Sequence, residues 1–376
     1  MTAHPIQLST EVLSWAARRA GSSLGEIAVK VSKRSEAILE GRLTLSQAEK
    51  YAQLTNIPLG FLFLEEAPAK RPVPLPDFRN VQDREPLGAE FFDVYDDVIY
   101  KQEWFRDYLA SIGAPPLAFV SKHKANTSPR ALAAAIFQDL KLDISTMRKA
   151  NTPEALYAYL SQLAERAGVL VFKNGVVGNN TRRGLPVSQF RGFAIVDPHC
   201  PVVFVNGADA KAAWAFTLLH ELAHIWVGES AVTDSAPQTN HPMEVLSNAT
   251  AAEILVPAEE FRVRWKALDV TVQEKLESLR LVFKVSTLVI ARRALDEGFI
   301  ERGVYAAIYE AARRSSSAGG GGDFYATLGA RNGKRFSDTV ARLAHSGELG
   351  LRQAGRLLNT SPSNVINYHE RRALPA

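Results

Sequence analysis

Apolar residues recur at helical spacing in the first part of the chain, and the intervals between the stripes are short. The stripes predict five short helices, at residues 12–19, 24–31, 35–39, 45–54 and 59–63. Ser23 and Glu26 have capping-box spacing before the second helix, and Ser32 precedes the third. Two helices joined by so tight a turn are typical of a helix-turn-helix, so we expect a compact domain of this kind at residues 1–68.

The pattern then changes twice. A proline-rich stretch at residues 69–90 predicts an extended linker, because proline has no amide donor. Helical stripes return at residues 93–111, 128–139 and 152–166. Short β-branched or aromatic runs bounded by Gly, Pro and Asn follow, and they predict a small sheet at residues 168–172, 193–196 and 202–205.

The last part of the chain contains a second change of composition. Residues 314–322 hold four consecutive glycines after a run of serines, which predicts a flexible linker. Residues 323–376 predict a small basic helical unit with 8 Lys or Arg against 4 Asp or Glu, and with a second helix-turn-helix outline. Its charge favours nucleic-acid binding, and a solvated basic appendage is the alternative.

His220-Glu221-Leu222-Ala223-His224 lies in an apolar stretch, residues 211–227, that lacks Pro and Gly and predicts a buried helix. Four residues advance a helix by slightly more than one turn, so both imidazoles project from one face and can bind one Zn²⁺. Glu221 then lies beside the metal and can act as a proton acceptor. Two histidines of an ordinary helix are the alternative, although burying them without partners is costly.

A catalytic zinc requires a third protein ligand, and five downstream side chains are candidates: Glu229, Asp234, His241, Glu244 and Glu253. The metzincin spacing is excluded, because Val227 and Ser230 stand where that pattern requires Gly and His. Residues 229–242 are loop-like, whereas residues 244–256 predict a helix of small residues that ends before Pro257.

Glu244 and Asn248 share one stripe of that helix, and a helix positions ligands more rigidly than a loop. We therefore expect Glu244 as the third ligand and Asn248 as the acceptor for the free ring N–H of a ligating histidine. Glu253 stays open as the rival ligand. His241 is either a loop residue or a substrate-facing group.

Zincin-type cleavage also needs a substrate held in an extended conformation. Residues 189–196 are our candidate for an exposed strand edge beside the metal, which would bind a peptide by β-strand addition. The substrate-binding candidates are Phe190, Arg191, Gly192, Phe193 and His241. An edge that is protected by Arg191 and serves only the fold is the alternative.

Several segments together carry a family resemblance: Pro74-Leu75-Pro76-Asp77-Phe78-Arg79, Phe190-Arg191-Gly192-Phe193-Ala194, Val205-Asn206-Gly207-Ala208-Asp209, His220 to His224, and residues 244–257. The chain resembles the ImmA/IrrE family of zinc metallopeptidases in its long form, with an N-terminal Xre-type helix-turn-helix. The resemblance implies a gluzincin-like site, with His220, His224 and Glu244 as ligands and Glu221 as the catalytic base. It also implies cleavage of a partner repressor.

Two functions follow from these features. The first is a zinc-dependent endopeptidase that cleaves a protein substrate, a transcriptional repressor, in gene regulation or stress response. The alternative is a DNA-binding regulator or antitoxin-like module whose metal-binding core is not proteolytic. Both share one α+β architecture, with a zincin-like core at residues 91–313 between the two helical units.

Charge and composition add little to this choice. The chain has 376 residues, a net charge of +4 and one cysteine, and 46% of its residues are hydrophobic. Residues 1–70 are nearly neutral, and their candidates for DNA contact are Lys30, Lys33, Arg34 and Arg42. The lone cysteine and the absence of a signal-like or 18-residue apolar run favour a cytoplasmic protein without a membrane partner. The oligomeric state is not indicated.

Overall fold

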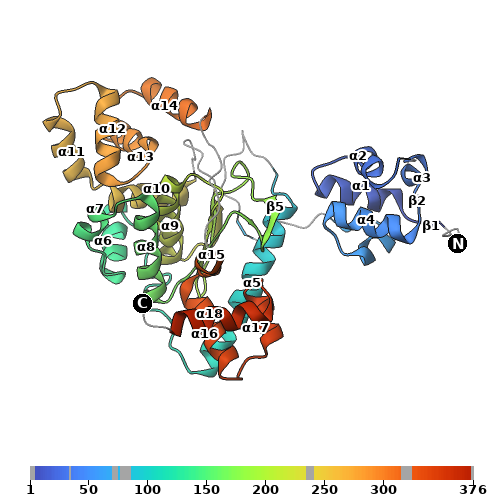
Figure 1. Cartoon of the computed structure of the whole chain (residues 1–376). Helices are drawn as coiled ribbons and strands as arrows, with labels where there is room; N and C mark the ends of the chain where they lie inside the picture. The colour runs from blue at the N-terminus through green and yellow to red at the C-terminus, as the bar shows by residue number, and fades with distance from the viewer. Residues whose placement is uncertain are drawn as a thin grey trace. The chain divides into compact units, whose positions relative to one another are not determined.

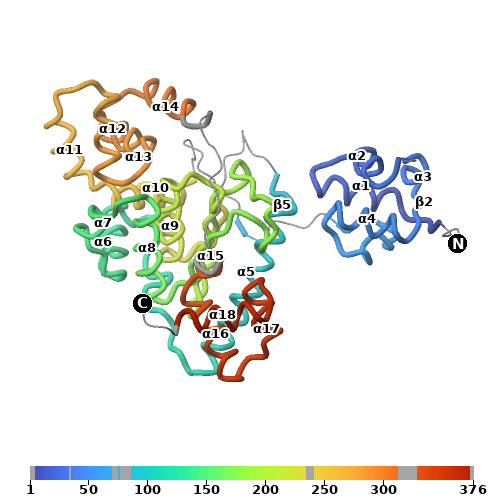
Figure 2. Tube along the Cα trace, viewed as in Figure 1, coloured from blue at the N-terminus to red at the C-terminus, as the bar shows by residue number. Residues whose placement is uncertain are grey.

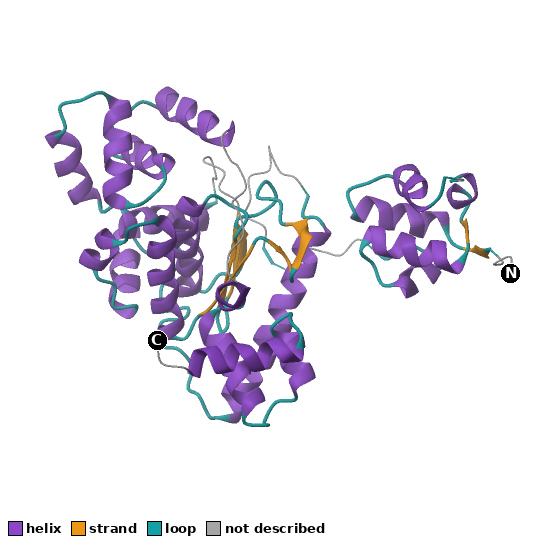
Figure 3. Cartoon of the chain, viewed as in Figure 1, coloured by secondary structure: helices purple, strands orange, loops and turns teal. Residues whose placement is uncertain are grey.

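The computed structural model of the chain describes residues 5–33, 35–69, 75–76, 86–233, 241–314 and 324–373. The chain divides into two compact units, Met1–Pro74 and Leu75–Ala376. The fold is α+β and mostly helical (Figure 3). None of the described helices is long and apolar enough to cross a membrane.

The first unit is a small helical bundle closed by a two-stranded antiparallel ribbon (Figure 1). Its elements are β1 (Ile6–Gln7), α1 (Thr10–Arg19), α2 (Leu24–Val31), α3 (Glu36–Leu39), β2 (Arg42–Leu43), α4 (Leu45–Thr55) and the 3₁₀ helix η1 (Leu59–Phe63). The five expected helices and the capping box of Ser23 and Glu26 are confirmed. Tyr51 is fully buried in the core, and its hydroxyl donates a hydrogen bond to the Leu13 carbonyl at 2.8 Å.

A four-stranded mixed sheet forms the centre of the second unit. Its strand order is β3 (Leu170–Asn174), β7 (Val202–Asn206), β6 (Gly192–Ile195), β8 (Ala231–Thr233), with β3 and β7 parallel and the other pairs antiparallel. A separate hairpin joins β4 (Val176–Val177) to β5 (Asn180–Gly184). The three expected strands are confirmed, but the expectation of a loop at residues 229–242 is wrong at β8.

Both faces of this sheet are covered by helices, which explains why its strands read as continuous apolar runs. Along β7, Val203 and Val205 enter one hydrophobic core, whereas Val202 and Phe204 enter the other. The first core contains α8 (Pro153–Ala167), α9 (Lys211–Val227) and α10 (Pro242–Leu255), together with α6 (Pro129–Asp139) and α7 (Ile144–Lys149). The second core contains α5 (Ala89–Ser111) and the C-terminal helices (Figure 2).

Four helices that follow α10 extend the first core: α11 (Ala258–Ala267), α12 (Val272–Phe283), α13 (Thr287–Asp296) and α14 (Arg302–Arg314). Four more end the chain: α15 (Phe324–Arg331), α16 (Lys334–His345), α17 (Leu351–Leu357) and α18 (Pro362–Ala373). Arg314 is the last residue of α14, and the remainder of the expected Ser/Gly linker lies outside the described residues. The expected proline-rich linker also lies largely outside them, and α5 begins at Ala89, within its expected range.

The C-terminal helices are not a separate compact unit, because they bury their apolar face against α5 and the sheet. Phe336 is fully buried, and its ring lies 5.6 Å from that of Phe172 and 5.7 Å from that of Phe105. A buried polar contact reinforces this packing, since Lys101 donates hydrogen bonds to Asp97 at 2.5 Å and to Asn332 at 2.8 Å. The described part of Leu75–Ala376 is therefore one compact unit that includes α15 to α18.

Glu165 at the end of α8 holds the first turn of α16. Its Oε1 accepts a hydrogen bond from the Arg335 backbone N–H at 3.2 Å, where a carboxylate is favoured by the helix dipole. Burial nevertheless raises the pKa of Glu165 to about 7. When folding raises the pKa of a carboxyl group, the folded state binds the proton more tightly than the unfolded state does.

We expect stability to depend on pH through this group. Its contribution is fully present below pH about 4.5 and is lost as the pH rises through about 7, by up to about 3 kcal/mol. Glu165→Gln keeps the acceptor oxygen but removes the titration, so the decrease in unfolding free energy between pH 5 and pH 8 should shrink. Urea denaturation at both pH values measures this. The exposed Glu259→Gln is the control, and an unchanged pH slope in Glu165→Gln would contradict the assignment.

Candidate metal centre

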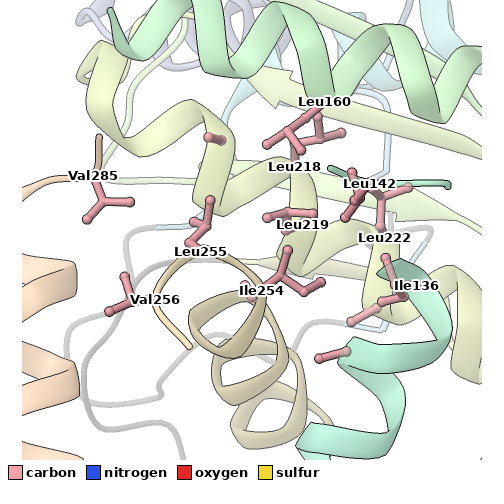
Figure 4. Close-up of a cluster of buried hydrophobic side chains, with 14 of the residues drawn as sticks. Ile136, Leu142, Leu160, Leu218, Leu219, Leu222, Ile254, Leu255, Val256 and Val285 are labelled. Atoms are coloured by element: carbon pink, nitrogen blue, oxygen red, sulfur yellow. The ribbon is translucent and has the colours of Figure 1, made fainter. Parts of the chain in front are cut away.

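Helix α9 carries the histidine pair, and its bounds are those expected from the sequence. Every residue from Leu218 to Val227 is buried. Figure 4 shows Leu218, Leu219 and Leu222 directed into the core, with Ile254 and Leu255 of α10 close by. Burial on all sides fixes the rotation of the helix about its axis, and this directs both imidazoles toward α10.

The carboxylate of Glu244 meets both histidines. Glu244 Oε2 lies 3.2 Å from His220 Nε2, and Glu244 Oε1 lies 3.2 Å from His224 Nε2. The two Nε2 atoms are 3.2 Å apart. All three side chains are at most 2% exposed. Among the described residues, they are the one group of three or more His, Cys, Asp or Glu side chains that could hold a metal ion.

The other ring nitrogens set the tautomers of these histidines. His224 Nδ1 lies 3.1 Å from the Glu229 backbone carbonyl, and His220 Nδ1 lies 3.0 Å from Asn248 Oδ1. Both partners are acceptors, so in a neutral ring Nδ1 carries the hydrogen and Nε2 presents a lone pair. Asn248 thus lies beside the free ring nitrogen of His220, as the spacing of the helix predicted.

Lone pairs on both Nε2 atoms and the negative charge of Glu244 therefore face one another in a buried space. Such an arrangement of acceptors is unfavourable unless protons or a metal cation lie between them. Burial opposes the ionisation of Glu244, but when the rings carry protons on Nε2, attraction to His220 and hydrogen bonds donated by both rings lower the Glu244 pKa to about 2. A metal cation would take the place of those protons. The nitrogen and oxygen donors match the preferences of zinc, with two imidazoles and one carboxylate, so the residues fit a zinc ion.

Glu221 lies next to this group but does not contribute to it. It is fully buried, and neither carboxylate oxygen has a hydrogen-bond partner among the residues that the structure describes. Burial raises the pKa of Glu221 to about 8, and the negative charge of Glu244 acts in the same direction. A cation between the histidines would favour the ionised form of Glu221.

Two cross-strand partners border the Glu221 carboxylate. Gly192 and Thr233 pair between β6 and β8, and a Cβ atom at Gly192 would lie 2.7 Å from Glu221 Oε1. Thr233 is also close to Glu221, although its hydroxyl is outside hydrogen-bond geometry. Sequence reasoning assigned Gly192 to the substrate and missed Thr233, because no spacing rule connects a strand residue to a helix across a sheet.

The other candidate ligands lie elsewhere or act differently. Glu253 accepts a hydrogen bond from Arg293 at 3.0 Å and is not in the group with the two histidines. Glu229 contributes its backbone carbonyl rather than its carboxylate. His241 is the N-cap residue of α10, and Asp234 lies outside the described residues.

The expectation of an exposed substrate-binding edge at residues 189–196 is wrong. Strand β6 has β7 on one side and β8 on the other, so it lies inside the sheet. Phe190 and Phe193 are fully buried in the second core and have no free surface for a substrate. The Arg191 guanidinium forms an ion pair with Asp209 at 3.3 Å.

Strand β8 is the edge of the sheet on this side. Its residue Val232 donates its backbone N–H outward, to the Pro76 carbonyl at 3.1 Å. Leu75, the neighbour of Pro76, is buried in the second core. The Val232 N–H at the β8 edge is therefore already hydrogen-bonded to another segment of the same unit.

The basic residues expected to contact DNA differ in exposure and in ion pairing. In the first unit, Lys30, Lys33 and Arg42 are exposed, Arg42 pairs with Glu40, and Arg34 lies outside the described residues. The second helix of the expected motif, α3, has four residues, and its first residue is Glu36.

Several basic residues of the C-terminal helices contact groups of the core, although Arg342 and Arg356 are also exposed to solvent. Arg335 donates to the Gly168 carbonyl, and Arg342 donates to the Tyr108 hydroxyl at 2.9 Å. The Arg356 guanidinium lies 4.7 Å from the centre of the Tyr100 ring. Part of the positive charge of residues 323–376 is therefore engaged in contacts within the unit.

Comparison with known families agrees with this site. Residues 164–295 match the model of the IrrE N-terminal-like domain, Peptidase_M78, and this segment contains both histidines, Glu221 and Glu244. The central segment is thus similar to a peptidase domain of the IrrE type. Residues 332–371 match a domain of unknown function, DUF8813. No curated protein and no solved structure matches the chain.

We expect Glu244→Gln to weaken Zn²⁺ binding by at least about 100-fold, because a change in an outer partner alone typically costs 10- to 100-fold. Glu253→Gln, on the same helix, should leave the affinity within about 3-fold of that of the unchanged protein. Equilibrium dialysis against zinc, followed by metal analysis, measures both. Loss of binding in Glu253→Gln with retention in Glu244→Gln would reverse the assignment.

Proposed function

We propose that this protein is a zinc-dependent endopeptidase of the gluzincin type that cleaves a protein substrate. The observation that carries the proposal is the convergence of His220 Nε2, His224 Nε2 and the Glu244 carboxylate beside the buried Glu221. The similarity of residues 164–295 to a peptidase domain supports the same conclusion.

His220, His224 and Glu244 would hold the zinc ion and leave one position for solvent or substrate. When bound, zinc acts as a Lewis acid and lowers the pKa of a coordinated water toward ~7. Asn248 and the Glu229 carbonyl keep the two rings oriented by accepting their Nδ1 hydrogens. Glu221 accepts the proton of the attacking water and then delivers it to the nitrogen of the leaving amine.

Desolvation of Glu221 supports its role in proton transfer. A carboxylate without hydrogen-bond partners is a stronger base than one in water, since nothing but a nearby cation stabilises its charge. The absence of a side chain at Gly192 leaves space for this carboxylate. A Cβ atom there would also meet the Phe204 carbonyl and the Thr217 methyl, so this space is enclosed on its other sides.

The substrate proposal rests on the family resemblance, which favours a transcriptional repressor as the cleaved protein. A cytoplasmic location and a role in gene regulation or stress response belong to the same proposal. DNA binding by the first unit stays a prediction of the sequence. The one-turn α3 and the nearly neutral charge of this unit give it little support.

We expect Glu221→Gln to reduce cleavage by at least about 10³-fold while zinc binding is retained, because the amide cannot accept the proton. Incubation with repressors encoded beside the gene, followed by mass spectrometry of the fragments, measures cleavage. The exposed Glu103→Gln on α5 is the control. Full cleavage by Glu221→Gln would reject the peptidase mechanism and favour a regulator with a non-proteolytic core.

Gly192→Ala tests the space around Glu221. The added methyl would lie 2.7 Å from Glu221 Oε1 and 2.9 Å from the Phe204 carbonyl, so the carboxylate or the strand must move. We expect cleavage to fall at least about 10-fold and stability to fall by about 1–3 kcal/mol, with zinc still bound. Gly184→Ala on β5 is the matched control, since nothing lies within 4 Å of its added methyl. Equal activity of the two variants would contradict the assigned role of Gly192.

A further inference from the structure

A cavity lies between the sheet and the C-terminal helices, and the proposed peptidase activity makes no use of it. Its volume is about 820 Å³, and it is lined by α8, β3, α15, α16 and α18. None of the residues of the metal centre lines it. The volume is in the range of pockets for small organic ligands.

Lys173 of β3 is one of the charged residues that line this cavity. Its ammonium lies 3.5 Å from the centre of the Trp214 ring and 4.4 Å from that of the Tyr157 ring. Within the described part of the chain it has no carboxylate or carbonyl partner. Burial lowers the pKa of Lys173 to about 8, although the charge of Glu154 opposes this shift. Lys173 is thus a partly desolvated cation held between two aromatic faces.

The charge around the cavity is positive. Lys173, Lys334, Arg371 and Arg372 line it, against two carboxylates, Glu154 and Glu165. Glu154 already forms an ion pair with Lys211 at 2.5 Å, and Arg372 forms one with Asp338 at 2.5 Å. Outside these two pairs, Lys173, Lys334 and Arg371 line the cavity against Glu165. Because burial raises the pKa of Glu165 to about 7, part of the population is uncharged at neutral pH. The balance favours an anionic ligand.

The remaining walls are largely aromatic or small. Tyr157, Tyr159 and Tyr368 contribute rings, while Gly329, Ala330 and Ala158 leave room beside them. Rings of this kind pack well against a planar group through offset or edge contacts.

We propose that this cavity binds a small organic anion with a planar ring, whose carboxylate or phosphate pairs with Lys173 and whose ring packs on the tyrosines. The Lys173 ammonium pairs with the negative charge of the ligand. The small residues of α8 and α15 leave space for its ring. Lys173 also contacts Trp214 in the first half of α9, so this side chain lies between the cavity and the helix that carries His220 and His224.

The test uses simple probes on the full-length protein. Phenyl phosphate and salicylate each combine a ring with an anion, whereas inorganic phosphate and phenol provide the two halves separately. Isothermal titration calorimetry or ligand-observed NMR measures the dissociation constants. We expect at least one ring-bearing anion to bind at least 10-fold more tightly than either half, and the tighter of the two identifies the anionic group.

Variants place this binding in the cavity. Lys173→Met, similar in length but uncharged, should weaken the tighter probe by at least 10-fold, and Lys173→Arg should restore most of the affinity. Ala158→Trp on the exposed side of α8 should fill the cavity and abolish binding. Ala134→Trp, an exposed position on α6, is the matched control and should bind normally.

The proposal is rejected if phenyl phosphate binds no more tightly than inorganic phosphate and salicylate no more tightly than phenol. It is also rejected if Lys173→Met and Ala158→Trp bind as well as the unchanged protein does, because the probe then lies elsewhere. Thermal unfolding of each variant shows that it is folded. None of these readouts depends on peptidase activity, so their failure is distinct from failure of the proposed function.

Discussion

The candidate site depends on one electrostatic constraint, the convergence of two imidazoles and one carboxylate that are buried between two neighbouring helices. His220, His224 and Glu244 are almost completely buried, and the hydrogen bonds at both Nδ1 atoms direct the Nε2 lone pairs toward the carboxylate. Protein interiors rarely tolerate such a group without a counter-charge. The most direct explanation is a site shaped for a divalent cation, with zinc the ion that best matches the donors.

The surrounding fold keeps these acceptors in place. Helix α9 is buried along its last three turns, between the sheet on one side and α8 and α10 on the others. Small residues of α10, among them Ser247 and Ala251, are fully buried and allow the two helices to approach closely. On the sheet, Gly192 provides the space for Glu221. Rigid elements on every side therefore position the site.

Much of this arrangement was predictable because it depends on local spacing. The interval between His220 and His224 directs both rings to one helix face, and Glu244 and Asn248 share a stripe one turn apart. The helices of the first unit follow from their apolar periodicity, which the structure confirms. Glu253 shows how the same helix separates a ligand candidate from a structural ion pair, since it faces Arg293 instead of the histidines.

Features set by long-range contacts were not predictable. Strand β6 is an inner strand, because it lies between β7 and β8. The apolar residues Phe190 and Phe193 are compatible with an edge strand or an inner strand, so the sequence could not distinguish the two. Strand β8 has three residues, too few for a periodic signal. Net charge could not predict the contacts of Arg335, Arg342 and Arg356, because a count of charges contains no information about partners.

X-ray absorption spectroscopy at the zinc edge of the zinc-loaded protein tests the central claim most directly. We expect one zinc ion per chain with about four nitrogen or oxygen neighbours at about 2.0–2.1 Å, two of them with the outer-shell scattering of imidazole. The carboxylate contribution should disappear in Glu244→Ala while both imidazoles remain. A spectrum with fewer than two imidazoles, or one unchanged by the loss of Glu244, would contradict the metal centre described here.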